Sequence, residues 1–375
     1  MFSFARHSKS KISNWWWTVD KVSFSLAVFL IFIGAMLVLS ASPSAAHRDR
    51  LADDFAFIKK QGVFIFMGLV LMIGVSMQSL RTIRRLAVFG FLCAFAGVVL
   101  TYVVGDATKG AARWIKFAGF SLQPSEFIKP VFIVVTAWLL DANKRIEDFP
   151  GMTLAVGLFL LTALSVFGQP DLGMTVLISG VWALQMVWAG IPVWLIMTLF
   201  SAGLVLVTGS YFFLAHVRDR IDRFLASENE IGSQIQKSMD AFANGNLLGR
   251  GPGEGYVKMT LPDVHTDFIF ALAGEECGVW LTTIIVAAFA AIVVRSMTLS
   301  MRDNNLFVMY AASGLAASLG GQAIVNMCSA LQLMPAKGMT LPFVSYGGSS
   351  MLASCLAMGM LLALSLIHIS EPTRL

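Results

Sequence analysis

One carboxylate stands at the predicted start of an apolar helix, in the stretch Val264-His265-Thr266-Asp267-Phe268. Partial burial raises a carboxyl pKa, whereas a helix N-terminus lowers it. A carboxylate under both influences suits a general base that takes the proton of an attacking hydroxyl. The plainer alternative is that Asp267 only caps the helix. His265, two residues earlier, is a second candidate for contact with a substrate.

A second polar group opens another apolar helix. Ser125 and Glu126 follow Pro124, which favours a helix start with a carboxylate in its first turn. Lys129 lies on the same face three residues later, so an intrahelical ion pair is one interpretation. The other is a cationic and aromatic site for an anionic lipid headgroup. The preceding loop would supply the rest of that site, with Arg113, Trp114 and Lys116.

A third group runs from Asn326 to Ser350, and its part from Pro335 to Ser350 combines two prolines, three glycines and four serine or threonine hydroxyls. Lys337 and Ser345 are its candidates for substrate contact. Irregular backbone at membrane depth occurs only where it is buried in protein or lines a cavity. In the hairpin Gln169-Pro170-Asp171-Leu172-Gly173 we expect a structural role instead, with Asp171 capping the next helix.

The composition identifies the setting of these groups. Of 375 residues, 57% are hydrophobic and 13% are charged, against about 25% charged in soluble domains. This excludes an ordinary soluble enzyme, a disordered protein and a nucleic-acid binder. The four cysteines show no metal or disulfide spacing. The net charge of +5 fits cytoplasmic loops that face anionic lipid.

The predicted fold is an all-α polytopic integral membrane protein with about ten transmembrane helices. A bilayer needs roughly 20 apolar residues per helix. Residues 22–364 form one membrane domain with a long outer loop at 215–267. The ten stretches are 22–42, 62–80, 86–105, 124–141, 151–168, 171–189, 191–214, 268–294, 306–334 and 345–364.

The two ends of the chain differ in character. Residues 1–21 form a basic leader with three tryptophans. The distribution of Lys and Arg among the short loops favours a cytoplasmic location for both termini. Residues 365–375 fit neither a helix end nor a basic tail. They read like the translation of a transposase adaptor used in DNA library preparation, so we interpret them as foreign.

Taken together, the motifs resemble the SEDS family (shape, elongation, division and sporulation proteins), and within it the cell-division branch. The resemblance covers about residues 20–364. It rests on Arg113-Trp-Ile, Gln123-Pro-Ser-Glu126 with Lys129, Gln169-Pro-Asp-Leu-Gly173, Leu261-Pro-Asp-Val-His-Thr-Asp-Phe-Ile-Phe270 with Gly274-Glu-Glu276, Pro335-Ala-Lys-Gly338, and Leu341-Pro-Phe-Val-Ser-Tyr-Gly-Gly-Ser-Ser350.

This resemblance implies a ten-helix glycosyltransferase that polymerises lipid II into peptidoglycan strands. The reaction would occur outside the bacterial inner membrane, at the division septum. Expected partners are a class B penicillin-binding transpeptidase and other division proteins. Asp267 matches the essential aspartate of the family, and Trp114 and Glu126 match residues of its outer cavity. Gln332 stands where much of the family has a small residue.

The chemistry follows from the substrate. An acceptor hydroxyl of one sugar attacks the anomeric carbon that carries the diphosphate, with Asp267 as general base and inversion at that carbon. The leaving diphosphate needs positive charge, for which Arg113, Lys116 and Lys337 are the candidates. Mg²⁺ or Mn²⁺ could share that task, although no metal-ligand spacing demands one, and no metal ligand or other cofactor is predicted.

Two other classes share some of these features. A lipid II flippase would also use a polar cavity and outer cations, but the chain shows no evident inverted repeat. A non-enzymatic division scaffold that recruits a transpeptidase would not need Asp267 at an outer mouth. Glu275 and Glu276 lie roughly 12 Å from Asp267 if one straight helix connects them. We therefore expect those two residues to organise the helix bundle.

Overall fold

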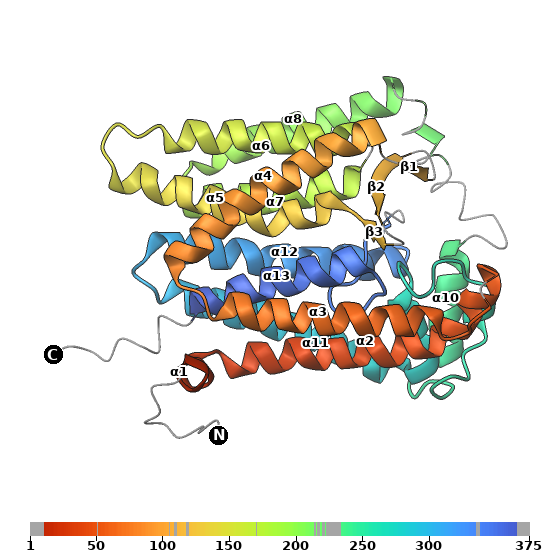
Figure 1. Cartoon of the computed structure of the whole chain (residues 1–375). Coiled ribbons are helices and arrows are strands. Elements are labelled where there is room, and N and C mark those ends of the chain that lie inside the picture. Colours follow the sequence, from red (N-terminus) through yellow and green to blue (C-terminus); the bar gives the residue numbers. More distant parts are fainter. Residues whose placement is uncertain are drawn as a thin grey trace.

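The structure is a computed structural model that describes residues 11–365, apart from 51, 105, 109–110, 118–119, 170, 214, 216–217, 220–221, 223–233 and 335–337. Ten long helices in these residues run along one axis (Figure 1). Each overlaps one predicted span, so the predicted fold class is confirmed. They are α2 (Lys21–Arg48), α3 (Ala56–Ser76), α4 (Leu80–Val104), α5 (Pro124–Arg145), α6 (Gly151–Gly168), α7 (Leu172–Trp188), α8 (Val193–Phe213), α11 (Ile269–Met301), α12 (Leu306–Ala330) and α13 (Gly348–Ser365).

Seven of these helices are long and apolar enough to cross a membrane: α2, α3, α4, α6, α11, α12 and α13. Several helices begin earlier than predicted. For example, α3 starts at Ala56 and α4 at Leu80, six residues before each predicted span. Charged residues such as Lys59 and Arg81 stay helical because long basic side chains can reach the water from the end of a helix.

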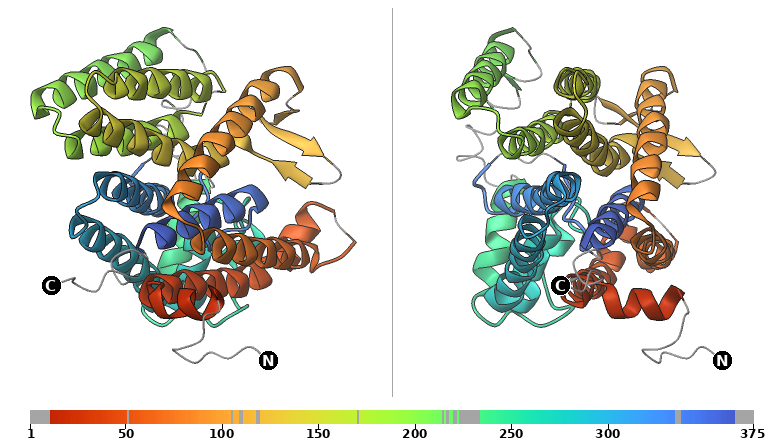
Figure 2. Two further views of the ribbon diagram at one scale, coloured as in Figure 1. Left: turned by 60° about the vertical axis from the view of Figure 1, so that its left-hand side comes forward. Right: turned by 90° about the vertical axis from the view of Figure 1, so that its left-hand side faces the viewer.

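Many polar side chains of the helices are buried in the interior, while large apolar side chains occupy both the core and the outer surface. α5, α12 and α13 are buried along most of their length, and Figure 2 shows α12 and α13 between the α6–α8 side and the α2–α3–α11 side. The outer helices expose large apolar side chains, such as Phe66, Phe89 and Leu164. This arrangement suits lipid as the surrounding solvent, since hydrocarbon cannot hydrogen-bond a polar group.

One end of the bundle carries all the strands of the described residues and a short helix. Strands β1 (Asp106–Thr108), β2 (Ala111–Phe117) and β3 (Phe120–Leu122) form an antiparallel sheet in the order β1-β2-β3. α10 (Gln234–Gly245) lies across this end (Figure 1), followed by the 3-10 turn η1 (Val257–Met259). Sequence analysis predicted only loops in both places, because short strands in a polar connection leave little periodic signal.

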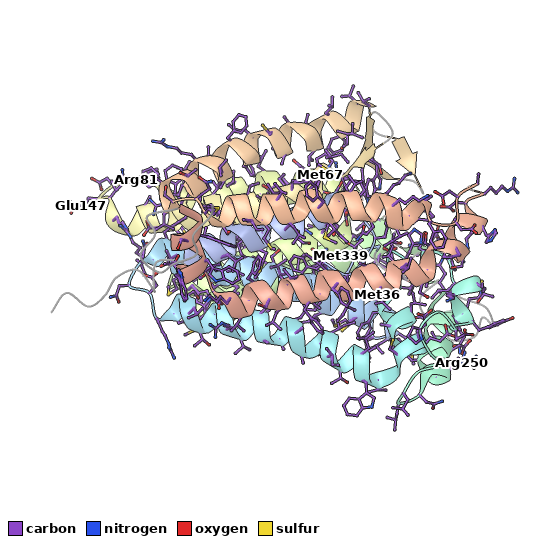
Figure 3. The ribbon with its side chains drawn as sticks, turned by 60° about the horizontal axis from the view of Figure 1, so that its bottom comes forward. Met36, Met67, Arg81, Glu147, Arg250 and Met339 are labelled. Atoms are coloured by element: carbon purple, nitrogen blue, oxygen red, sulfur yellow. The ribbon has the colours of Figure 1, made fainter. Side chains whose placement is uncertain are left out.

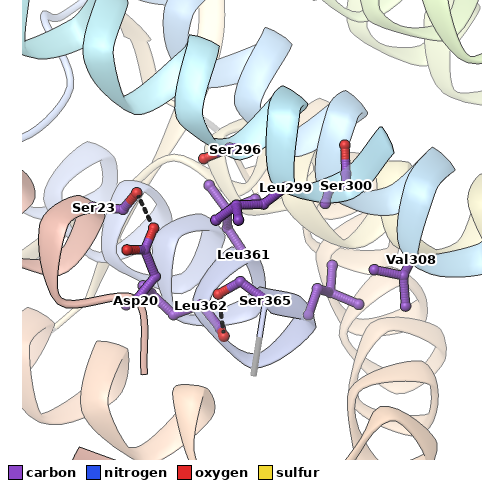
Figure 4. Close-up of a pocket in the computed structure, with 11 residues that line it drawn as sticks. Asp20, Ser23, Ser296, Leu299, Ser300, Val308, Leu361, Leu362 and Ser365 are labelled. Carbon is purple, nitrogen blue, oxygen red and sulfur yellow. Dashed lines mark hydrogen bonds between the residues drawn. The ribbon is translucent and has the colours of Figure 1, made fainter. Parts of the chain in front are cut away.

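The opposite end carries α1 (Lys11–Thr18) and the last turn of α13 (Figure 1). Figure 3 shows Arg81 and Glu147 at this end, Arg250 at the other, and Met339 among the helices between them. A small pocket here is lined by residues from four segments of the chain, and its polar members are Asp20, Ser23, Ser296, Ser300 and Ser365 (Figure 4). The Ser23 hydroxyl donates a 2.6 Å hydrogen bond to Asp20. The predicted foreign tail beyond Ser365 lies outside the described residues.

α11 is not the straight helix that sequence analysis assumed. Gly278 has φ 71° and ψ −166°, which interrupts the helical backbone. The outer loop supplies the missing backbone partners: the Val279 N–H donates to Asn246 O at 3.1 Å, and the Arg250 and Gly251 N–H groups donate to the carbonyls of Glu275 (3.0 Å) and Glu276 (2.9 Å). The break is therefore satisfied by main-chain groups from about 30 residues away.

Glu275 and Glu276 fasten this loop to α11. The Glu275 carboxylate accepts hydrogen bonds from the Tyr256 (2.9 Å) and Val257 (3.0 Å) N–H groups. Glu276 forms a buried ion pair with Lys258 at 2.9 Å and accepts a hydrogen bond from Ser40 of α2. Both carboxylates were expected to organise the helix bundle. The structure shows that they hold the 215–267 loop on α11 instead, and that among the described residues only Glu276 also reaches a second helix, through Ser40.

Candidate active site

Asp267 lies in a compact turn, residues 261–268, here called the Asp267 turn. Its main-chain N–H donates to the Asp263 carbonyl at 3.0 Å, as does the Thr266 hydroxyl at 3.1 Å. α11 begins at Ile269 and its N-cap residue is Phe268. The alternative that Asp267 serves as the helix cap is therefore wrong, because Asp267 lies one residue outside the cap. Its side chain is half-buried.

A second irregular segment, residues 338–346, closes over this turn and is here called the clasp loop. The Tyr346 N–H donates to His265 O at 2.8 Å. The Ser345 hydroxyl donates to Thr266 O at 2.6 Å and accepts from the Leu341 N–H at 2.8 Å. Ser345, predicted to contact substrate, is buried here and joins the two segments. The predicted irregular backbone of this region thus packs inside protein.

The clasp loop brings its first residue against the Asp267 carboxylate. Gly338 has φ +63°, a backbone conformation that favours glycine. A Cβ atom added to Gly338 would lie 3.6 Å from Asp267 Oδ2, in ordinary van der Waals contact. The carboxylate therefore faces the main chain at Gly338. Lys337, the preceding residue and a predicted diphosphate ligand, lies outside the described residues.

Asn326 of α12 binds both segments at once. Its Nδ2 group donates to Asp267 O at 2.9 Å and to Met339 O at 2.7 Å. The side chain is 1% exposed, and its Oδ1 has no hydrogen-bond partner among the described residues. Because both contacts are to carbonyls, the orientation of the amide is determined by its partners.

The predicted ion pair of α5 forms part of the same network. Lys129 Nζ lies 2.6 Å from Glu126 Oε2, and both side chains are buried. Lys129 also donates to Gln322 Oε1 of α12 at 2.5 Å, and Gln322 Nε2 donates to Thr340 O of the clasp loop at 2.9 Å. Glu126 and Lys129 are thereby connected through α12 to the segment that faces Asp267.

His265 is a packed residue of the Asp267 turn. Its ring lies 4.5 Å from the ring of Phe57 and 5.3 Å from that of Tyr346, measured between centroids. Burial lowers its pKa below the usual 6.5, although the nearby charges of Asp263 and Asp49 oppose that shift. The imidazole is therefore neutral at pH 7.

Arg113 lies in a different corner of the outer end. Its guanidinium pairs with Asp171 at 3.2 Å and donates from Nε to Gln169 O at 3.0 Å. Asp171 also caps α7 by accepting from the Met174 N–H, as predicted. The charge of Arg113 is therefore already compensated. Trp114 is half-buried on β2, and Lys116 occupies the same strand, with its side chain outside the described part.

Sequence reasoning missed several residues of this site. Gln322 had no assigned role, and Asn326 was named only as the start of a polar region. A signal was available, because two amides four residues apart in an apolar helix lie on one face and are costly in lipid. Arg48, which the sequence shows only as one charge in a short loop, donates to Leu261 O at 2.8 Å. In the described residues, no group of three or more His, Cys, Asp or Glu could hold a metal ion.

Comparison with known proteins identifies the family. A family model described as "Cell cycle protein", which carries the names of FtsW, RodA and SpoVE, matches residues 20–368. The chain belongs to the SEDS family. It is 41% identical over 362 residues to a "Probable peptidoglycan glycosyltransferase FtsW" of Caulobacter vibrioides, covering 96% of this chain and 93% of that protein. A protein of the same name from Geobacter metallireducens is 37% identical over 359 residues, covering 92% and 94% of the two chains.

Solved structures of SEDS proteins share the architecture. A chain from a peptidoglycan synthase complex, described as coordinating polymerization and crosslinking, superposes with a TM-score of 0.79 at 25% identity. The match covers 95% of this chain and all of that one. Rod shape determining protein RodA of Thermus thermophilus gives a TM-score of 0.68 at 24% identity, covering 95% of this chain and 99% of that one.

Proposed function

We propose that this SEDS protein is a peptidoglycan glycosyltransferase of the division type, which polymerises lipid II into glycan strands at the outer face of the bacterial inner membrane during septal synthesis. The observation that carries the proposal is a half-buried carboxylate, Asp267, enclosed by two loops at one end of a membrane bundle. The names of the relatives support the reaction class, and the synthase complex supports a transpeptidase partner.

The reaction that we assign to Asp267 is a single displacement. The carboxylate accepts the proton of a sugar hydroxyl on the acceptor while the hydroxyl oxygen forms a bond to the anomeric carbon of the donor. The bond from that carbon to the diphosphate oxygen breaks, and the lipid diphosphate leaves with the electron pair. One attack from the opposite face inverts the configuration, whereas a retaining enzyme would need a second carboxylate as nucleophile.

The leaving diphosphate needs a cation close to the reacting carbon. Arg113 is paired with Asp171, and Lys129 is buried against Glu126. Lys337 directly precedes Gly338, whose main chain faces the Asp267 carboxylate. We therefore assign the diphosphate contact to Lys337 first. Trp114 and Lys116, on the strand β2, are assigned to the outer lip that admits the lipid-linked sugar.

The orientation that we propose places both termini in the cytoplasm. α1 and the end of α13 lie at one end of the bundle, whereas α10, the sheet and the Asp267 turn belong to the other (Figure 1). Lipid II presents its sugars outside the inner membrane, so the Asp267 end faces the periplasm. A partner transpeptidase of class B would cross-link the strands on that same side.

The test uses the purified full chain with its transpeptidase partner and labelled lipid II, with glycan polymers resolved on a gel. Asp267→Asn keeps the shape of the side chain and removes the base, so we expect a loss of about 10²–10⁴-fold in polymerisation. Asp263→Asn is the matched control, because it makes the same change four residues earlier at a φ of 54° that asparagine tolerates.

Native-level activity in the control and none in Asp267→Asn would support the assignment. If Asp267→Asn and Asp263→Asn both make as much polymer as the native chain, Asp267 is not the base. If the native protein makes no polymer but moves lipid II across sealed vesicles, the flippase alternative replaces the enzyme. If it does neither and still recruits the transpeptidase, the scaffold alternative does.

A further inference from the structure

Asn326 is the residue through which α12 holds the Asp267 turn and the clasp loop together. A single buried amide donates to one carbonyl in each segment, at 2.9 Å to Asp267 and 2.7 Å to Met339. Met339 adjoins Gly338, whose main chain faces the Asp267 carboxylate. The amide thus binds the two main-chain segments on either side of that contact.

The rest of α12 makes this connection rigid. One turn earlier on the same face, Gln322 donates to Thr340 O and receives a hydrogen bond from Lys129. The Thr340 hydroxyl in turn lies 2.5 Å from that of Ser350 at the start of α13. The clasp loop is therefore held at residues 339 and 340 by two α12 amides, and only the amide of Asn326 extends to Asp267.

We infer that Asn326 is a positioning residue, which sets the Asp267 carboxylate relative to the clasp loop for the transfer step. This inference rests on the proposed function. Asn326 acts through the main chain of Asp267 and not through contact with the substrate. Removing its amide takes one donor away from the main-chain carbonyl of Asp267 and one from that of Met339, which allows the turn and the loop to move apart. A displacement of about 1 Å at a reacting group can reduce the rate by about 100-fold.

The chain offers a closely matched control in Gln185 of α7. Its Nε2 group also donates to two main-chain carbonyls, Ile133 at 2.9 Å and Tyr310 at 3.2 Å. It is likewise fully buried, and in the described part of the chain its Oε1 also has no hydrogen-bond partner. Gln185→Leu therefore removes a buried bridging amide whose contact with α12, at Tyr310, lies 16 residues before Asn326, or about 24 Å along the helix.

The experiment compares Asn326→Leu, Gln185→Leu and the native chain in complex with the transpeptidase. Polymerisation of labelled lipid II is measured across substrate concentrations, and thermal unfolding is followed in the same detergent. We expect the two variants to lose similar melting temperature. We also expect kcat to fall about 10–100-fold in Asn326→Leu alone, with KM for lipid II within about twofold of the native value.

A fall in kcat of the same size in both variants would overturn the inference, because a general loss of packing would then explain it. So would a native kcat in Asn326→Leu. If that variant does not fold, Asn326→Thr retains one hydroxyl donor. A native kcat in folded Asn326→Thr, together with faster amide hydrogen exchange in residues 263–268 than in the native chain, would equally overturn it. If the native chain itself makes no glycan polymer, that result refutes the proposed function and not the role of Asn326 alone.

Discussion

Single residues in this protein are best understood by what their polar atoms contact inside the bundle. Ser345 is buried with both of its hydrogen bonds to main chain, and Arg113 is paired with Asp171. Both are polar residues of the kind that predicts substrate contact, yet each fastens two segments. The reason is general, since a buried polar group without a partner costs about 1–3 kcal/mol. The type of such a residue shows that its position matters. Only its hydrogen-bond partners show whether the side chain joins two segments or takes part in the reaction.

His265 leads to a prediction about pH. Burial lowers its folded-state pKa below the unfolded value of 6.5. As the pH falls below about 6.5, the unfolded chain binds a proton that the folded chain excludes, so stability decreases by up to about 1.4 kcal/mol per pH unit. Above that pH both states are neutral and the contribution vanishes. The melting temperature of His265→Gln should therefore depend less on pH between 6.5 and 5 than that of the native chain.

The control for this prediction is His47→Gln. His47 is an exposed histidine at the end of α2, with 77% of its side chain accessible. That variant should keep the acid-side decline of the native protein. A decline of the same steepness in His265→Gln would contradict the assignment of the effect to His265.

At the scale of elements, the break in α11 couples the outer loop to the membrane bundle. An added Cβ at Gly278 would lie 2.5 Å from Gly249 N, and the φ of 71° is unfavourable for any other residue. We expect Gly278→Ala to destabilise the protein by roughly 3–5 kcal/mol, because it combines backbone strain with overpacking. Thermal unfolding in detergent measures the loss.

Gly180 of α7 provides the comparison for Gly278. No heavy atom lies within 4 Å of a Cβ added there, so Gly180→Ala should be neutral or stabilising by up to about 1 kcal/mol. Equal melting temperatures for the two alanine variants would show that the break in α11 imposes no requirement for glycine.

These elements also show what the sequence can and cannot predict. Ten spans were predictable because about 20 apolar residues in a row form a local signal. The break at Gly278 was not, since its backbone partners come from residues 246–251. Asp267 was recognisable as a carboxylate beside an apolar helix. Its positioning by Asn326 depends on a contact across 59 residues of chain, which no local pattern encodes.

At the scale of the whole molecule, two polar clusters connect α2 and α11 near their opposite ends. Asp20 pairs with Arg295 at 2.8 Å, and Ser40 donates to Glu276, which also pairs with Lys258. The clusters are separated by 20 residues of α2 and 19 of α11, or about 29 Å of helix. That distance matches the roughly 30 Å hydrocarbon core of a bilayer.

The clusters therefore delimit the expected membrane region. Trp16 and Trp17, which are exposed and lie near Lys21, fall at the boundary on the α1 side, and aromatic side chains concentrate at such boundaries. Asp267 lies nine residues before Glu276 in the chain, in a turn that is hydrogen-bonded to the clasp loop. Val344 of that loop packs against Gly34 of α2, so we expect Asp267 near the boundary marked by Ser40 and Glu276, inside protein. This is the level at which a membrane-anchored diphosphate would present its sugars.

Cysteine accessibility tests this placement in a variant that lacks the four native cysteines. Ala52→Cys, between α2 and α3, should react with a membrane-impermeant maleimide in intact spheroplasts, because it is exposed on the Asp267 side. Ser79→Cys, between α3 and α4, should react only after permeabilisation. Phe32→Cys lies between the clusters, and 62% of Phe32 is exposed. Its thiol should nevertheless remain unmodified in both conditions, because ionisation to the reactive thiolate requires water.

Labelling of Ser79→Cys in intact spheroplasts would reverse the orientation, and labelling of Phe32→Cys would displace the membrane from the two clusters. Either result would also move Asp267 away from the level of the lipid-linked sugars, and the mechanism would then need a different base.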